Sequence, residues 1–162
     1  MSPAELIAIG ALVISIAGFA LWFRGRRSRE ERRAIQEFRT QRERLEAKFF
    51  DLAAASGKPR GLRWVNCDWG RDVTFARDAR TSLLTAFVAV EIQFEAVEGG
   101  DMEDVDAVGT IRDASAVFHY QAGQWGTGGK ALFNMNPQEA LKRLTDQFEP
   151  IESQPAGGDN LS

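Results

Sequence analysis

The apolar segment at residues 6–23 constrains this chain more than any other feature of its sequence. Its 18 residues contain no charged side chain. As an α-helix the segment would be roughly 27 Å long, close to the thickness of the hydrocarbon core of a bilayer. A helix that is apolar on every side needs cover on every side, which lipid provides and a small soluble domain does not. The sequence therefore predicts a transmembrane anchor over residues 1–23.

A cluster of arginines directly follows the apolar segment and forms a basic juxtamembrane neck over residues 24–33. Arginines beside a membrane helix stay in the cytoplasm and attract anionic lipid headgroups. Tryptophan at the same end prefers the membrane interface. We therefore expect a single-pass protein of the cell membrane, with its N-terminus outside and its C-terminal domain in the cytoplasm. The expected membrane-surface residues are Trp22, Arg24, Arg26, Arg27, Arg29, Arg32 and Arg33.

Two alternatives concern the same segment. A secretion signal would also be apolar, and Gly18, Phe19 and Ala20 faintly resemble a cleavage site. However, no lysine or arginine precedes the segment and the arginines follow it, which favours an uncleaved anchor. Ala11 and Ser15 have the spacing of small residues at which two membrane helices can pack, so a homodimer through the anchor stays open.

The charge of the remaining chain changes sign along the sequence. Residues 24–63 contain 13 Lys and Arg against 6 Asp and Glu, which is +7. Residues 64–162 contain 7 against 16, which is −9. An acidic domain argues against a nucleic-acid partner, because that binding depends on basic residues that neutralise phosphates. Cys67 is the only cysteine, so the chain cannot form an internal disulfide.

The sequence predicts one soluble α+β domain over residues 34–152. A long helix at residues 28–56 ends at Gly57 and Pro59. Its apolar stripe consists of Ile35, Phe38, Leu45, Phe49 and Leu52, and Arg42 interrupts the stripe. Alternation with a period of two then predicts about five antiparallel strands. These strands are expected at residues 62–68, 73–77, 83–96, 107–120 and 125–133, with a turn at 68–72 and a hairpin at 121–124.

A last helix closes the predicted domain. Asn136 is its expected N-cap, followed by Pro137 and Glu139, and its buried stripe extends to Phe148. Hairpins with helices on one face of a sheet make an α+β domain. This order of elements is similar to that of cystatin-like and NTF2-like proteins, a likeness that assigns no residue a role. Residues 153–162 are rich in Gly, Pro and polar residues, which predicts a disordered tail.

The residue types of a thiol–imidazole–carboxylate site are present in Cys67, Asp68 and His119. His119 is the only histidine, so any catalytic imidazole must belong to it. One cysteine and one histidine are also what an ordinary domain of this size contains. The glycine-rich residues 123–131 lack the spacing and the hydroxyl of a phosphate-binding loop, so we expect them to bend a strand or let a helix approach closely. The sequence predicts no cofactor.

Acidic and aromatic residues supply the other candidates. The acidic loop has oxygen ligands for Ca²⁺ without the spacing of a calcium loop, and it could instead dock to a basic partner, including the neck. Its carboxylates are Asp101, Glu103, Asp104 and Asp106. Aromatic side chains serve either a core or a ligand or partner surface. The aromatic candidates are Trp64, Trp69, Trp125 and Tyr120.

These observations favour a membrane-anchored protein that presents a cytoplasmic α+β domain for protein association or ligand binding. The sequence does not identify the protein partner, and no catalytic motif supports an enzyme. The alternative is a pocket in a curved sheet that binds or converts a small molecule with His119, Cys67 and Asp68. A concave face filled by Phe49, Leu52 and the tryptophans would argue against that alternative.

Overall fold

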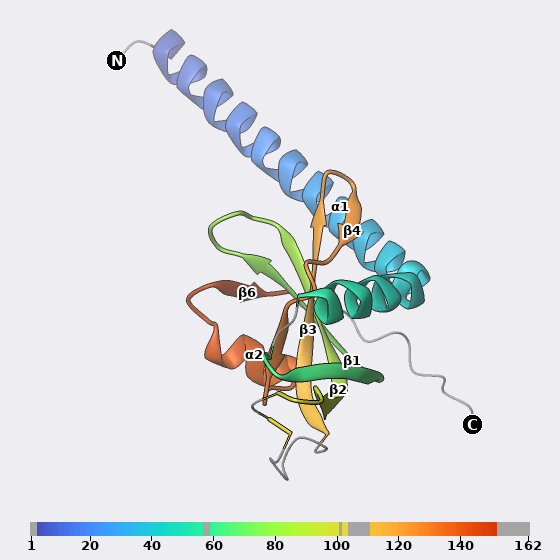
Figure 1. Cartoon of the computed structure of the whole chain (residues 1–162). Coiled ribbons are helices and arrows are strands. Elements are labelled where there is room, and N and C mark those ends of the chain that lie inside the picture. The colour runs from blue at the N-terminus through green and yellow to red at the C-terminus, as the bar shows by residue number, and fades with distance from the viewer. Residues whose placement is uncertain (1–2, 57–58, 101, 104–110, 152–162) are drawn as a thin grey trace, which may run out of the picture. The chain divides into compact units, whose positions relative to one another are not determined.

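The computed structural model describes residues 3–56, 59–100, 102–103 and 111–151 (Figure 1). The chain divides into two compact units, residues 1–40 and 41–162. The long helix α1 (Pro3–Ala55) belongs to both. The second unit combines the end of α1 with a six-stranded antiparallel sheet and the short helix α2 (Pro137–Arg143). The expected α+β fold class is therefore confirmed.

In the first unit, α1 is long and apolar enough to cross a membrane, by its length and composition. Its large apolar side chains are exposed around the helix: Ile14 is 74% exposed, Leu21 72% and Phe19 64%. None of its most apolar window is buried within the described structure, so this part of α1 is not packed as a core helix there. The Ser15 hydroxyl donates to the Ala11 carbonyl oxygen at 2.9 Å, which satisfies this polar group within the helix itself.

The strands of the second unit are ordered β4–β3–β2–β1–β6, and β5 also pairs with β3. They are β1 (Leu62–Asp78), β2 (Leu84–Ala96), β3 (Arg112–Gln121), β4 (Gln124–Gly126), β5 (Ala131–Phe133) and β6 (Phe148–Pro150). The central strand β2 follows its predicted alternation, since every second residue from Leu84 to Phe94 is buried. Because one face of β2 is buried, it fixes the register in which its two neighbours β1 and β3 pair with it.

Strand β1 differs from its prediction. Residues 62–78 form one long strand, not two strands joined by a turn. Both halves pair with β2: Trp69 stands opposite Val90 and Val73 opposite Val88, so residues 70–72 form a bulge. The prediction of a turn was wrong because β2 is long enough to pair with both halves, and the turn-type residues serve an irregularity within one strand.

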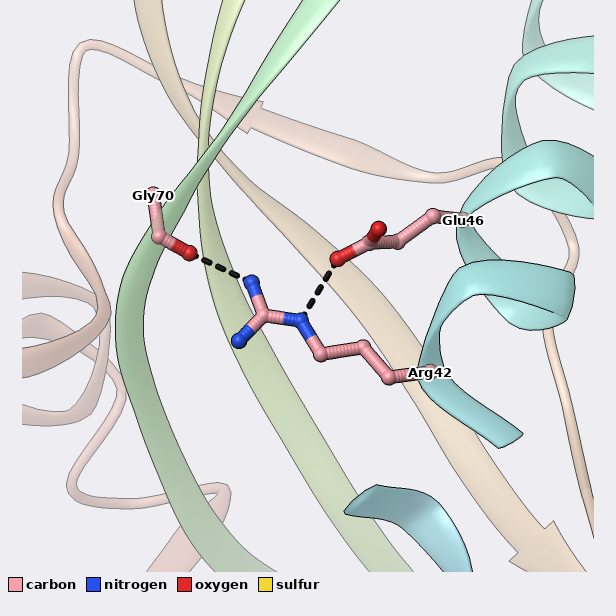
Figure 2. A network of polar contacts seen from close by, with 3 residues as sticks. All are labelled: Arg42, Glu46 and Gly70. Carbon is pink, nitrogen blue, oxygen red and sulfur yellow. Dashed lines mark hydrogen bonds and ion pairs between the residues drawn. The ribbon is translucent and has the colours of Figure 1, made fainter. Parts of the chain in front are cut away.

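This bulge explains the charged residue that interrupts the apolar stripe of α1. The Arg42 guanidinium donates to the backbone carbonyl oxygen of Gly70 in the bulge. It also donates, through Nε at 2.6 Å, to Glu46 Oε1 one helical turn away. Figure 2 shows the guanidinium between these two acceptors. Because the Glu46 side chain is only 13% exposed, this charge-assisted bridge joins helix and sheet where little water reaches.

The stretch predicted as one strand at residues 125–133 is divided into β4 and β5. His119 stands opposite Gly126 and Ala116 opposite Ala131, so residues 127–130 loop out beside only two residues of β3. The first residues of the strand predicted at 107–120 lie outside the described residues, and β3 begins at Arg112.

The hairpin expected between β3 and β4 is confirmed. Gln121 pairs with Gln124 across it. The two central residues both have positive φ, 51° at Ala122 and 79° at Gly123. A two-residue loop of this kind matches the twist of the adjoining strands.

The C-terminal helix is shorter than predicted. Its capping box is confirmed, since Asn136 Oδ1 accepts from the Glu139 N–H at 2.8 Å and Glu139 Oε2 accepts from the Asn136 N–H at 3.1 Å. The helix ends at Arg143, however, and Phe148–Pro150 pairs with β1 as β6. The edge of β1 offers unpaired backbone groups to this segment, and pairing there buries Phe148 as a helix would have done.

The two helices pack on opposite faces of the sheet, not on one face as predicted. Phe49 of α1 contacts Phe118 of β3, with ring centroids 5.8 Å apart. The neighbouring Val117 belongs to the core that α2 covers through Ala140. Adjacent strand residues point to opposite faces, so the sheet has a core on each side. The α1 side is aromatic, with Phe49, Trp64, Trp69, Phe94, Phe118 and Phe133.

Gly129 lets α1 approach the sheet closely, as the glycine-rich sequence suggests. Its φ is +72°, and a Cβ atom there would lie 2.7 Å from the backbone nitrogen of Ala53. Ala53 is fully buried, whereas Leu52, which was predicted in the buried stripe, is 39% exposed. The contact between the main chains of α1 and of Gly129 leaves room only for a small side chain. Ala53 is therefore the buried residue of this turn, where the sequence predicted Leu52.

We expect Gly129→Ala to lower the free energy of unfolding by at least about 2 kcal/mol, because it adds a strained φ to a backbone clash. Gly128→Ala is the matched control, since no atom lies within 4 Å of its Cβ position. The control should change stability by less than about 0.5 kcal/mol. Chemical denaturation of the full chain in detergent measures both. Equal losses in the two variants would contradict the close approach.

Arg42→Met should lower the free energy of unfolding by about 1.5–3 kcal/mol, because Glu46 and the Gly70 carbonyl lose a charged donor. Adding Glu46→Gln should recover part of this loss, since the remaining partner is then uncharged. The exposed Arg39, changed to Met, serves as control. A loss no larger than that of the control would show that the bridge is unimportant.

Candidate functional site

Two clefts of similar size and opposite charge lie in the second unit. The acidic cleft has a volume of about 440 Å³, and its charged lining residues are Asp68, Glu91, Asp113 and Glu139. The basic cleft has a volume of about 430 Å³, and its charged or titratable lining residues are Arg44, Lys48 and His119. Among the described residues that line them, the first has no basic side chain and the second no acidic one.

The register of the sheet creates the acidic cleft. Asp68 stands opposite Glu91, and Glu91 opposite Asp113, so three neighbouring strands contribute a row of carboxylates. Directly opposed side chains have Cβ atoms roughly 4.5–5.5 Å apart, and like charges at that separation destabilise a sheet. Glu139 adds a further carboxylate from the first turn of α2. The row therefore gathers negative charge at one exposed surface of the sheet.

The same register separates the thiol from the imidazole. Cys67 stands opposite Ile92, and His119 stands opposite Thr85, seven residues away along β2. At the rise of a β-strand this corresponds to roughly 23 Å. Cys67 and Asp68 are adjacent in β1 and point to opposite faces of the sheet. The structure therefore does not bring Cys67, Asp68 and His119 into one site.

The surroundings of Cys67 and His119 keep both side chains uncharged near pH 7. Burial, with a smaller contribution from the charge of Asp68, raises the pKa of the Cys67 thiol to about 12. A thiol that stays protonated is a poor nucleophile. Burial lowers the pKa of His119 below its ordinary value, Lys130 acts in the same direction, and Asp78 opposes them. His119 Nδ1 lies 3.2 Å from the Thr85 hydroxyl oxygen.

The four aromatic candidates all take part in packing. Trp64 and Trp125 are buried, at 8% and 5% exposure. Trp69 packs against Phe49 with centroids 5.5 Å apart, and Tyr120 packs against Trp125 at 5.4 Å. Trp69 also lines the acidic cleft, and Trp125 lines the basic one. Each cleft therefore has one tryptophan among its lining residues.

The sheet face beneath α1 is filled. Phe49 is fully buried there and contacts Trp64, Trp69 and Phe118, with centroid distances of 6.2, 5.5 and 5.8 Å. Leu52 does not contribute to this filling, since it is partly exposed. An enclosed pocket needs empty space on this face, so the packing argues against the alternative of a pocket in a curved sheet.

Of the carboxylates of the predicted acidic loop, the structure describes only Glu103. Its Oε2 accepts a hydrogen bond from the Gly99 backbone N–H at 2.8 Å. Asp101, Asp104 and Asp106 lie outside the described residues. Within the described part of the chain, no three His, Cys, Asp or Glu side chains are grouped so that they could hold a metal ion.

The residues expected at the membrane surface are helical and exposed. Trp22 is 57% exposed, and the guanidinium carbon of Arg26 lies 5.6 Å from the centroid of its ring system, a cation–π contact. The other arginines of the neck are also exposed: Arg24, Arg27, Arg29, Arg32 and Arg33.

Sequence reasoning did not find most residues that line the two clefts. Glu91 lies in a strand that alternation predicts, but its neighbours Asp68 and Asp113 follow from a register that alternation does not specify. Arg44 and Lys48 are four residues apart in a predicted helix, so their common face was available as a signal. The sequence did not indicate, however, that the predicted hairpin lies opposite these two residues. Comparisons with protein-family models, curated proteins and solved structures found no match to this chain.

Proposed function

We propose that this chain is a single-pass membrane protein that holds its α+β domain at the cytoplasmic face of the cell membrane, where the domain associates with a protein partner. The observation that carries this proposal is the exposed apolar part of α1, followed along the same helix by exposed arginines. Lipid is the environment that covers such a helix on all sides. The arginines then favour a cytoplasmic domain.

The continuity of α1 supports an anchor over a secretion signal. The helix has no break between Pro3 and Ala55, including residues 18–20 where a cleavage site was considered. Its last turns belong to the second unit, where Phe49 is fully buried. Cleavage at residues 18–20 would leave the arginines at the start of the remaining helix, with no apolar segment to place them at a membrane.

The acidic cleft supports association with a basic partner. The opposed carboxylates of Asp68, Glu91 and Asp113 repel one another in the free protein. Lysine or arginine side chains of a partner, placed across this row, would offset the repulsion and would also be steered to it over a distance. Glu139 extends the acidic surface onto α2 and enlarges the area that a basic segment could contact.

Membrane topology can be tested with single cysteines in a Cys67→Ser background, which removes a poorly reactive native thiol. We expect Ser2→Cys to react with a membrane-impermeant maleimide in intact cells. Cysteine at the exposed Glu98 should react only after lysis. Labelling after lysis proves that this position is accessible. Labelling of the Glu98→Cys variant in intact cells, or loss of residue 2 from the mature chain, would place the domain outside and overturn the proposal.

Association at the acidic cleft can be tested with a fluorescent octa-arginine peptide and the full chain in neutral nanodiscs. Glu91→Gln with Asp113→Asn should weaken binding at least about tenfold, because both charges lie in the row. Glu98→Gln with Glu149→Gln removes the same charge from exposed sites away from the cleft and should weaken binding less than about threefold. Equal weakening would mean that net charge binds the peptide, and the cleft would not be the partner surface.

A further inference from the structure

The basic cleft lies between α1 and the segment around the β3–β4 hairpin. One wall is a turn of α1 that carries Arg44 and Lys48. The opposite wall contains the hairpin residues Gln121 and Gln124 together with residues 126–128. Its volume of about 430 Å³ lies in the range of small-molecule sites, which is roughly 300–1,000 Å³.

The charge of this cleft is opposite to that of the unit around it. Residues 41–162 contain 13 Lys and Arg against 19 Asp and Glu, which is −6. Arg44 and Lys48 are nevertheless one helical turn apart and both exposed, and no ion pair joins either of them to a described residue. Like charges at this spacing repel. An anion between the two would receive charge-assisted hydrogen bonds from both side chains.

The opposite wall leaves its main chain accessible to such an anion. Gly126 and Gly128 have no side chains, and a Cβ atom at either would meet nothing within 4 Å. The Thr127 hydroxyl between them is already engaged, since it donates to the Val117 carbonyl oxygen at 2.9 Å and accepts from the Gly129 N–H at 3.0 Å. These bonds hold the segment in place. Gln121 and Gln124 add polar amides at the rim.

We propose that this cleft binds a phosphate-bearing small ligand, with the phosphate held between Arg44 and Lys48. Arginine matches the oxygens of a phosphate with paired N–H groups, and lysine adds a compact charge. The volume exceeds what one phosphate needs, so an organic group accompanies it. A soluble phosphate ester and a phospholipid headgroup share this chemistry. The proposal stands whichever side of the membrane the domain occupies.

His119 provides a reporter at the wall of the cleft, with its imidazole beside Thr85 on the face of β3 opposite to that of Phe118. It is the only histidine of the chain, so selective isotope labelling of histidine gives a single set of imidazole resonances. It lines the cleft, and Asp78 and Lys130 are the charged groups that influence its pKa in the free protein. A phosphate bound in the cleft would favour the protonated imidazole and raise this pKa.

The test follows the His119 resonance of the full chain in phosphatidylcholine nanodiscs as glycerol 3-phosphate is added at constant ionic strength. A second series has no added phosphate ester and replaces part of the lipid with phosphatidic acid. We expect a saturable shift and a raised His119 pKa in at least one series. A response to the soluble ester identifies a soluble ligand, and a response to phosphatidic acid alone identifies a headgroup.

Charge variants decide whether the response belongs to the cleft. Arg44→Gln with Lys48→Gln should weaken binding at least about tenfold, because both cations contact the phosphate. Arg39→Gln with Lys142→Gln removes the same charge from exposed positions that do not line the cleft and should leave binding within about threefold. No shift of His119 in either series, or equal weakening by the two double variants, would overturn the proposal.

Discussion

The contact between the last turns of α1 and the sheet supports the rest of the second unit. Phe49 occupies the centre of the aromatic face, and Gly129 lets the main chain at Ala53 come close. Arg42 adds a charge-assisted bond to the carbonyl of Gly70. Apolar burial stabilises this contact but does not fix the orientation of the helix on the sheet. The hydrogen bond of Arg42 depends on geometry and therefore restricts that orientation.

The bulge in β1 and the loop between β4 and β5 have consequences beyond packing. The bulge after Trp69 presents the Gly70 carbonyl to Arg42, and the looped segment that begins after β4 contributes Thr127 and Gly128 to one wall of the basic cleft. Irregular strand pairing often re-aims side chains near functional sites. Here the irregularities border both clefts, since Gly70 also lines the acidic one.

The chemistry of the described residues is better suited to binding than to covalent catalysis. Cys67 keeps its proton, and it is far from His119 along the sheet. The charges, by contrast, are gathered in two places, with carboxylates on one cleft and cations on the other. The two surfaces of opposite charge are separate, since the two clefts share no lining residue.

The sequence alone determined the features that depend on local order. These are the apolar length of α1, the capping box at Asn136, the hairpin turn at Gly123 and the alternation of β2, because spacing and residue type specify them directly. The tertiary structure decided whether residues 68–72 reverse the chain and whether Phe148 ends a helix or a strand. It also decided which charges become neighbours. Each of these depends on a partner strand far away in the chain, so no local pattern contains the answer.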